Sequence, residues 1–453
     1  MSAGGVKVAL RASSALGLLV LIATQAHAGG FALREQSAAG QGSSFAGVAA
    51  GGALSSMFWN PAIMTQFAGK TMEMDASAVI PKASQSYTSS SLATSLGALN
   101  PGYRNGVDNS GDSAFVPSSY GSYQLTDKIW LGLSVNSPFG LSVAFPQAWA
   151  GATYGQGADV KSFNFQPAIA YKFNNWISIA VGAQIQYMKV GYDQLGIIPG
   201  LPPTIRMANL SGSGYGFGFT AGLTLTPTPT TTIGIGYRSA INQKISGTLD
   251  TGGLAGSTPG SIETTLNLPD TVTVGLRQGI GDRFTLLAGF EWSNWSRIGT
   301  AVVTTASGGT ATLVGSPVQL PFQYSDGYFY SLGGEYIVDP TLTLRAGIAF
   351  EKSPITDAVR TPRLPDNDRM WYSAGLSYKP PQFRGVTMDL GYSYIDAKDT
   401  PINLGPGSGN PWGTGATSPV YVGSVDSHIH VLSFGFRYQW DAPEVRKTAL
   451  ITK

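Results

Sequence analysis

Residues 428–440 read HIHVLSFGFRYQW, and this stretch decides the fold. Large apolar side chains occupy every second position from Leu432 to Trp440, and small or polar residues stand between them. Because successive side chains of a β-strand point to opposite faces, one face of this segment is apolar and aromatic, and the other is polar. An apolar, aromatic exterior and a polar interior are typical of a strand in a transmembrane β-barrel.

The composition of the whole chain agrees with a barrel. Only 12% of the 453 residues are charged, against about a quarter in soluble domains. Glycine is abundant at 59 residues, and no mature segment offers the roughly 20 apolar residues of a spanning helix. The net charge of +2 argues against a nucleic-acid partner, which needs a basic surface. The absence of cysteine excludes disulfides, thiolate nucleophiles and Cys-ligated metals.

The N-terminus predicts export. Lys7 and Arg11 precede an apolar run at 15–23, which is followed by Ala26-His27-Ala28. This order is typical of a signal peptide cleaved after Ala28. Cleavage removes two basic and no acidic residues, so 28 − 2 = 26 basic residues remain against 26 acidic ones. A cysteine-free, exported barrel is expected in the outer membrane of a Gram-negative cell, as a multi-pass protein.

The segment 29–69 differs from the rest of the chain. It lacks a period of two, is rich in glycine, alanine and serine, and carries charge only at Arg34 and Glu35. Short helical turns broken by glycine predict a hatch that plugs the lumen. The expected organisation is a signal peptide at 1–28, this hatch at 29–69, a barrel at 70–440 and a periplasmic tail at 441–453.

Beyond Lys70 the pattern predicts an all-β fold, a 14-stranded antiparallel transmembrane β-barrel with a partly helical N-terminal hatch in its lumen. Tight turns alternate with long Gly/Pro/Ser segments, as in barrels with short periplasmic turns and long extracellular loops. The strands are expected near 70–82, 113–125, 128–145, 159–173, 176–190, 213–226, 230–249, 263–279, 283–303, 322–338, 341–353, 366–379, 385–397 and 420–440. The long loops are expected at 83–112, 191–212, 250–262, 304–321 and 398–419.

The alternation places one charged residue per strand in the lumen, from the seventh strand to the last. These residues are Arg238, Arg277, Glu291, Glu335, Arg345, Arg369, Asp389 and Arg437. One interpretation is a lattice of ion pairs that stiffens the wall and anchors the hatch, since buried charges need partners. The other is that some of the arginines bind the carboxylate of a ligand.

Several short motifs occur along the chain. Gly30-Phe31-Ala32-Leu33 and Asn60-Pro61-Ala62 lie in the hatch segment, and further matches follow along nearly the whole mature chain. They are Tyr237-Arg238-Ser239, Glu291-Trp292-Ser293-Asn294-Trp295-Ser296, Leu344-Arg345-Ala346-Gly347, Ser353-Pro354 and Pro365-Asp366-Asn367-Asp368-Arg369. In this order they resemble the FadL/TodX family of outer-membrane transporters for long-chain fatty acids and other hydrophobic compounds.

The resemblance implies passive uptake through a hatch-plugged barrel of 14 strands. It implies gating residues at Phe31, Asn60, Pro61 and Ala62, and lateral release at an inward kink of the third strand that the Asn-Pro-Ala turn contacts. That strand contains Asn136-Ser137-Pro138-Phe139-Gly140. Proline cannot donate to a strand ladder and glycine weakens a strand interior, so an interruption is expected here. The alternative places Pro138 beyond the membrane, where the strand meets its loop.

The resemblance also implies capture among the outer loops. The run 195–203 is apolar, and Ile197, Ile198 and Leu201 could join Phe145 and Trp149 in an exposed apolar site. The same loop could instead fold back as a dry lid. Lumen candidates for the ligand are Lys189, Gln184, Gln186, Arg238, Arg345 and Arg369, although strict alternation places Lys189 with the outward residues.

Other functional classes fit less well. The mature chain has two histidines, His428 and His430, and no G-x-S-x-G motif, so we expect no enzyme, cofactor or metal. A general porin would not need a plug of this size. We expect a monomer in contact with outer-membrane lipid and lipopolysaccharide. Long-chain fatty acids are the first substrate hypothesis, and monoaromatic hydrocarbons or other lipophiles are the second.

Overall fold

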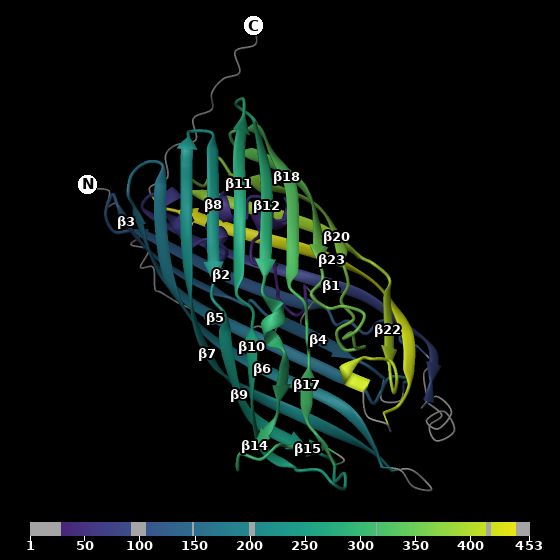
Figure 1. Ribbon diagram of the computed structural model, residues 1–453. Coiled ribbons are helices and arrows are strands. Elements are labelled where there is room, and N and C mark those ends of the chain that lie inside the picture. Colours follow the sequence, from purple (N-terminus) through teal and green to yellow (C-terminus); the bar gives the residue numbers. More distant parts are fainter. Residues whose placement is uncertain are drawn as a thin grey trace, which may run out of the picture.

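The computed structural model describes residues 29–91, 106–146, 149–198, 204–313, 315–413 and 418–440. It forms a closed antiparallel barrel of 14 strands that are strongly inclined and enclose a short helical segment (Figure 1). The predicted signal peptide at 1–28 and the predicted tail at 441–453 lie outside the described residues. None of the described helices is long and apolar enough to cross a membrane.

The barrel spans follow each other as antiparallel neighbours, and β23 pairs with both β21 and β1 to close the sheet. The spans are β1 (Lys70–Ser90), β2 (Ala114–Gln124), β3 (Ile129–Asn136) with β4 (Gly140–Ala144), β5 (Gly157–Lys172), β6 (Ile177–Ile198), β7 (Thr204–Thr228), β8 (Thr231–Arg238) with β9 (Ile241–Asp250), β10 (Gly260–Leu268) with β11 (Thr271–Ile280), β12 (Phe284–Ser293), β18 (Gly327–Asp339), β19 (Leu342–Lys352), β20 (Arg369–Tyr378), β21 (Val386–Ala397) with β22 (Thr400–Leu404), and β23 (Tyr421–Gln439). The predicted architecture and strand order are confirmed.

Tight turns gather at the end of the barrel nearer the hatch, which is the upper end in Figure 1. At the opposite end the strands run on into longer connections. Short strands in one of these connections are β13 (Thr300–Val302), β14 (Thr304–Thr305), β15 (Thr312–Leu313), β16 (Ser316–Pro317) and β17 (Gln319–Pro321). A short helical turn, η4 (Trp295–Ile298), precedes them, and η5 (Pro411–Gly413) follows β22.

One expected loop is largely strand, and another is strand in its first part. β6 and β7 pair continuously from Ile177↔Leu225 to Ile198↔Thr204, so the predicted loop 191–212 is wrong for its described residues, and residues 199–203 lie outside the description. Likewise, β1 continues to Ser90, into the segment expected to be a loop from 83. Glycine and proline in 191–212 and serine in 83–90 hid these extensions, because the hydrogen bonds that stabilise them come from partner strands rather than from local propensity.

The predicted assignment of faces is confirmed on the last strand. Leu432 and Phe434 are 51% and 50% exposed on the outside, whereas Val431 and Ser433 are fully buried on the inside. This is the arrangement expected for a barrel with lipid around it and a filled lumen.

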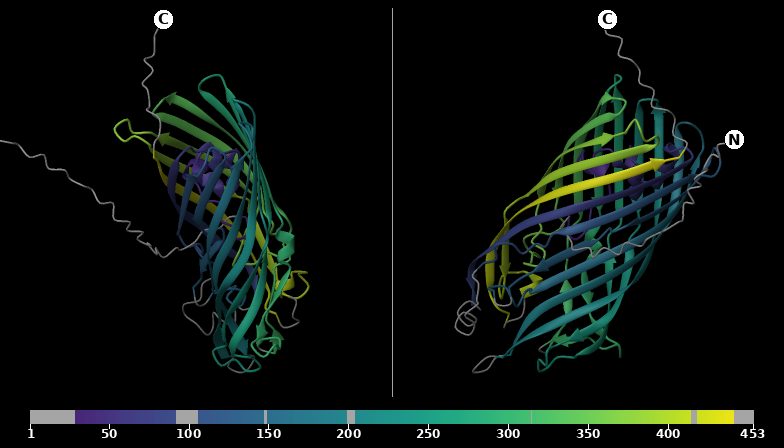
Figure 2. Two further views of the ribbon diagram at one scale, coloured as in Figure 1. Left: turned by 90° about the vertical axis from the view of Figure 1, so that its left-hand side faces the viewer. Right: turned by 180° about the vertical axis from the view of Figure 1, so that it is seen from behind.

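The hatch fills the lumen with four short helical turns (Figure 2). They are α1 (Ala38–Gln41), η1 (Val48–Ala50), η2 (Leu54–Phe58) and η3 (Pro61–Gln66). Asn60 caps η3, since its side-chain oxygen accepts a hydrogen bond from the nitrogen of Ala62, and Pro61 occupies the first helical position. A Cβ on Gly236 of the wall would lie 1.8 Å from the carbonyl oxygen of Trp59, so glycine is required for this close approach.

Candidate functional site

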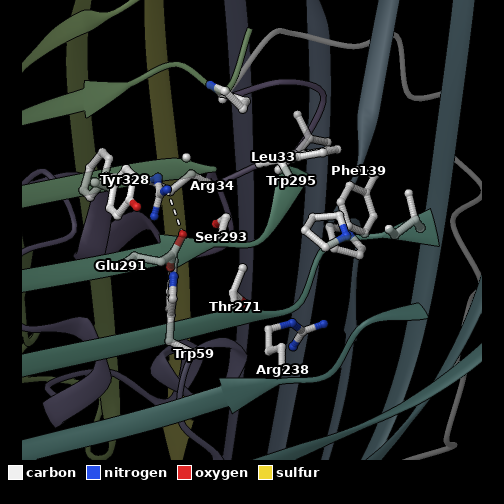
Figure 3. Close-up of a pocket in the computed structure, with 18 of the residues that line it drawn as sticks. Leu33, Arg34, Trp59, Phe139, Arg238, Thr271, Glu291, Ser293, Trp295 and Tyr328 are labelled. Carbon is white, nitrogen blue, oxygen red and sulfur yellow. Dashed lines mark hydrogen bonds and ion pairs between the residues drawn. The ribbon is translucent and has the colours of Figure 1, made fainter. Parts of the chain in front are cut away.

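A pocket lies between the first residues of the hatch and the barrel wall (Figure 3). Its volume is about 80 Å³, and it is lined by aromatic and apolar side chains together with charged and amide groups. The apolar lining includes Leu33, Trp59, Phe139, Ile241, Leu268 and Trp295. The polar lining includes Arg34, Gln184, Arg238, Glu291 and Glu351.

Phe31 packs into the aromatic group beside this pocket. Its side chain is 3% exposed, and its ring centroid lies 4.8 Å from that of Trp295 and 5.8 Å from that of Phe139. The preceding Gly30 has a φ of 68°, and a Cβ there would lie 3.0 Å from the Trp295 ring. Only glycine adopts this backbone freely, so the turn into Phe31 depends on it.

Arg238, at the end of β8, has amides rather than acids as its side-chain partners. One terminal nitrogen donates to Gln166 Oε1 at 2.8 Å and to the carbonyl oxygen of Phe58 at 3.0 Å, and the other donates to Gln184 Oε1 at 2.6 Å. The guanidinium also lies over the Phe58 ring, 4.3 Å from its centroid. These contacts orient the side chain and leave its charge uncompensated by any direct ion pair.

No carboxylate of the described residues lies within 4.0 Å of Arg238. The internal segments outside the description are 92–105, 147–148, 199–203, 314 and 414–417, and none of them contains an Asp or Glu. Within the described part of the chain, Arg238 is therefore a cation of the barrel interior with no carboxylate in ion-pair contact.

Arg345 and Arg369, the other two arginine candidates, are already paired. Arg345 lies between Glu335 at 2.8 Å and Asp389 at 3.3 Å. Arg369 contacts Glu351 at 3.2 Å and Asp366 at 2.6 Å. For both arginines, the ion-pair lattice is the interpretation that the geometry favours.

Lys189 does not line the lumen, and its candidature was wrong. Its side chain is exposed on the outer face of β6, whereas Gln184, Gln186 and Met188 are buried on the inner face. The alternation of a regular strand leaves no other arrangement. The two glutamines do point inward, and Gln186 donates to Gln243 Oε1 at 3.1 Å.

The third span is interrupted where the sequence predicted it. β3 ends at Asn136 and β4 begins at Gly140, with Ser137, Pro138 and Phe139 between them. The hatch supplies backbone partners to this interruption. Leu33 donates its N–H to the carbonyl of Pro138 at 2.8 Å, and Gly140 donates its N–H to the carbonyl of Phe31 at 2.8 Å.

The wall ladder is also interrupted beside this kink. Pairing between β2 and β3 stops at Ser119↔Val135, and an isolated bridge resumes it at Gly111↔Val143. Gln36 of the hatch covers the gap from inside. Its amide nitrogen donates to the carbonyl of Ser137 at 2.8 Å, and its own carbonyl accepts from the Ser118 hydroxyl at 3.1 Å.

Asn60 lies elsewhere, which corrects the contact that the resemblance implied. Its side-chain nitrogen donates to the carbonyls of Ala49 at 2.7 Å and Leu223 at 3.0 Å. The Asn60-Pro61-Ala62 turn is thus bound to η1 and β7. The hatch residues that are hydrogen-bonded to the kink are Phe31, Leu33 and Gln36.

Two of the five predicted capture residues are described, and these two do not form an exposed apolar site. Trp149 is fully buried and its ring stacks on that of Phe145, with centroids 4.5 Å apart. Ile197 and Ile198 belong to β6, but their side chains lie outside the description, as does Leu201. The predicted role of these three residues in capture, and the alternative that their loop is a dry lid, stay predictions.

A separate cavity of about 560 Å³ lies among the outer connections. Arg363 lines it together with Tyr192, Leu210, Leu320 and Trp412. Arg363 donates to Gln194 Oε1 at 2.9 Å and lies 5.3 Å from the centroid of the Tyr192 ring. Burial lowers the pKa of Arg363 to about 10, so it remains a cation at neutral pH.

Sequence reasoning placed Glu291 in the lumen but missed Glu351, the second acidic residue that holds the start of the hatch. Arg34 pairs with Glu291 at 2.9 Å, and the carboxylates of Glu291 and Glu351 raise the pKa of Arg34 although burial lowers it. Glu35, its neighbour, is 1% exposed, and burial raises the pKa of its carboxyl to about 7. Glu351 shares its strand face with Arg345, six positions earlier, and that parity could have identified it.

The two histidines of β23 contact each other and an aromatic residue of β21. His430 Nδ1 lies 2.9 Å from the Tyr392 hydroxyl, and its ring centroid is 5.6 Å from that of His428. Within the described ranges, no group of three or more His, Cys, Asp or Glu residues is arranged to bind a metal ion.

Comparisons with known proteins agree with this architecture. A family model described as "Outer membrane protein transport protein (OMPP1/FadL/TodX)" matches residues 19–440. The "Long-chain fatty acid transport protein" of Escherichia coli (strain K12) is 28% identical over 435 residues, which cover 87% of this chain and 94% of the relative. "Outer membrane protein P1" of Haemophilus influenzae (strain Rd) is 26% identical over 421 residues, covering 84% and 88%.

Two solved structures show the same fold. A Pseudomonas aeruginosa FadL homologue superposes with a TM-score of 0.78 at 22% identity, over 90% of this chain and 99% of that one. The Pseudomonas putida toluene transporter TodX gives a TM-score of 0.60 at 16% identity, over 90% and 99%.

Proposed function

The chain belongs to the OMPP1/FadL/TodX family of outer membrane transport proteins, and we propose that it carries long-chain fatty acids across the outer membrane. The observation that carries this proposal is Arg238. It places a cation without a carboxylate partner next to an apolar pocket. A fatty acid needs both features, because its carboxylate seeks a charge-assisted hydrogen bond and its chain seeks an apolar groove.

The proposed route begins at the outer cavity. Arg363 and the apolar side chains around it offer the same combination of a cation and apolar surface as the lumen pocket does. A fatty acid captured there would pass inward to Arg238, Gln184 and the aromatic group around Phe31. This proposal gives no direct role in binding to the residues first predicted for capture, which are Phe145, Trp149, Ile197, Ile198 and Leu201.

The hatch has to move for the ligand to be bound and released. Binding pockets for drug-sized ligands usually measure about 300–1,000 Å³. The lumen pocket measures about 80 Å³. A shift of Phe31 would enlarge it, and would also break the hydrogen bonds that Phe31 and Leu33 make to the kink. We infer that this shift opens the interruption between β2 and β3, and that the ligand leaves sideways into the membrane without an energy source.

Monoaromatic hydrocarbons are the second candidate substrates. They would use the same apolar pocket and the same kink, but they would not need Arg238, because they carry no charge. A general, water-filled porin is less well supported, since the hatch fills the lumen with buried side chains such as Leu54, Met57 and Trp59.

The test is uptake by a Gram-negative host that lacks its own fatty-acid transporter and expresses this chain. Labelled oleate and labelled toluene are measured for the wild type, Arg238→Gln and Lys189→Gln. The lysine variant is the matched control, because it removes a positive charge from the outer face. We expect saturable oleate uptake that Arg238→Gln reduces about tenfold and Lys189→Gln leaves unchanged, with no effect of either on toluene.

Two further variants test the exit. Pro138→Ala and deletion of Phe31 are expected to slow oleate uptake without preventing insertion of the barrel. Toluene uptake without oleate uptake would move the substrate to hydrocarbons. If a correctly inserted barrel takes up neither compound, the transport proposal is wrong for both substrate classes.

A further inference from the structure

The first two residues of the hatch are held by their backbone nitrogens. The nitrogen of Gly29 lies 3.1 Å from Glu351 Oε1, and the nitrogen of Gly30 lies 3.0 Å from Asp366 Oδ2. Both glycines are buried inside the barrel. A Cβ on Gly29 would lie 2.6 Å from the same oxygen of Glu351, so a side chain at this position would displace the carboxylate.

These two carboxylates belong to a buried network of charges. Arg34 contacts Glu291 at 2.9 Å and Glu351 at 3.8 Å, and Arg369 contacts Glu351 at 3.2 Å and Asp366 at 2.6 Å. The direct ion pairs therefore join three carboxylates to two guanidinium groups. Each of the three acids is less than 10% exposed, so an uncompensated negative charge here is costly.

Signal-peptide removal would change the charge at one of these contacts. Hydrolysis of the Ala28–Gly29 bond, which the sequence predicts, consumes one water molecule, leaves a carboxylate on Ala28 and leaves an amine on Gly29. That amine takes up a proton at neutral pH. The nitrogen that donates to Glu351 in the structure would then be an ammonium group, and its hydrogen bond would be charge-assisted.

We propose that the α-ammonium of Gly29 is the third positive charge of this network, and that signal-peptide cleavage thereby latches the hatch in its seated position. The network then contains three carboxylates and three cations. The latch lies two residues from Phe31, whose carbonyl binds Gly140 at the kink, so it secures the segment that covers the interruption in the wall. This inference rests on the predicted cleavage site and does not depend on which substrate the protein carries.

The position of the ammonium can be tested through its reactivity. The mature protein is purified in detergent, its N-terminus is identified by mass spectrometry, and it is treated with 2-pyridinecarboxaldehyde, which modifies α-amines selectively. Two changes should expose the amine. Glu351→Gln removes the partner, and insertion of two serines between Ala28 and Gly29 moves the charge away while keeping every side chain of the network.

We expect the wild-type amine to react at least tenfold more slowly than the amine of either altered protein. Asp357→Asn is the matched control. It removes one negative charge from a different ion pair, with Arg360, and should leave the protection unchanged. The seated hatch should also make the wild-type barrel less conductive to ions in planar bilayers than the serine-extended barrel.

Three results would overturn the proposal. They are a mature N-terminus at another residue, a wild-type amine as reactive as that of the extended chain, and equal protection in wild type and Glu351→Gln. If Glu351→Gln fails to insert, the serine-extended chain alone decides, because it changes no side chain of the barrel.

Discussion

Inward arginines on two sides of the lumen have different partners. On the wall formed by β11, β18, β19 and β21, Arg345 is bound by Glu335 and Asp389, and Arg277 also binds Glu335. On the wall formed by β5, β6 and β8, Arg238 faces the amides of Gln166 and Gln184. Both arginines point inward, and both donate hydrogen bonds to side chains of other strands.

The difference lies in the charge that remains. A carboxylate orients a guanidinium and neutralises it, whereas an amide orients it and leaves its charge intact. The first arrangement stabilises the wall and offers little to a ligand. The second holds a cation in place, ready for an anion that arrives later. An inward arginine can therefore either stabilise the wall or bind an anion. Which of the two it does depends on whether its partners are carboxylates or amides.

The largest expected effect is on the acidic wall. Arg345→Ala leaves Asp389, which is 1% exposed, without its ion pair, and breaking a buried pair typically costs about 3–5 kcal/mol. Urea unfolding of the barrel in detergent should show a loss of this size. Arg238→Ala should cost less than half as much, because amides are left behind rather than charges. Equal losses would remove the distinction between the two walls.

The next largest effect on stability is expected at Glu35. Its buried carboxyl has neither an ion-pair partner nor an amide partner among the described residues. Neither of its carboxylate oxygens has a hydrogen-bond partner within the described part of the chain. Burial raises the pKa of this carboxyl from its ordinary 4.5 to about 7, so the fold favours the protonated form. The contribution of the Glu35 carboxyl to the free energy of unfolding is fully present below pH 4.5 and is lost as the pH rises to about 7. This contribution amounts to about 3 kcal/mol.

Glu35→Gln should therefore be more stable than the wild type above pH 7 and should lack this part of the pH dependence. Melting temperatures of both proteins at pH 4, 6 and 8 provide the measurement. Glu263→Gln, which changes an exposed acid on β10, is the control and should follow the wild type. Parallel curves for Glu35→Gln and wild type would show that Glu35 is charged in the folded protein.

Gln184→Glu should make the amide wall resemble the acidic one. The new carboxylate would replace the amide oxygen that lies 2.6 Å from Arg238 and would neutralise the cation. We expect the affinity for oleate, measured by equilibrium dialysis at pH 8, to fall about tenfold, or about 1.4 kcal/mol. The affinity for toluene should not change. Gln186→Glu is the control, since Gln186 binds Gln243 instead of Arg238. An equal loss in both variants would indicate general repulsion from the lumen.

The smallest expected effect on uptake is that of replacing Arg363. Like Arg238, it is oriented by an amide, that of Gln194, but it lies at the outer cavity. Arg363→Gln should raise the oleate concentration at half-maximal uptake about threefold or less and leave the maximal rate unchanged. Lys398→Gln, at an exposed position of an outer connection, should have no effect. A fall in the maximal rate alone would place Arg363 outside the capture step.

Strand number, order and facing followed from the sequence because the environment of a barrel strand is uniform. Every strand has lipid on one side and the lumen on the other, so alternation alone places Leu432 outside and Ser433 inside. The proline in the third span likewise predicted the break after Asn136, since proline has no N–H to donate. The prediction for Lys189 was wrong because it followed the family resemblance, whereas strand alternation placed this side chain on the outer face.

Partners separated far along the chain did not follow from the sequence. Asn60 binds the carbonyl of Leu223, 163 residues away, and Arg363 binds the amide of Gln194, 169 residues away. Local patterns carry no record of either contact. The same is true of Gly29 and Glu351, which are 322 residues apart and meet only because the hatch folds back into the closed barrel.

The sequence by itself determined which side chains enter the lumen, because a strand alternates with a period of two whatever its neighbours are. Only the tertiary structure decided which of the inward charges are neutralised. An ion pair requires two groups within about 4 Å, and strand register and the seating of the hatch set that distance. Arg345 and Arg238 are alike in the sequence, and their different partners give one a structural role and the other a proposed role in transport.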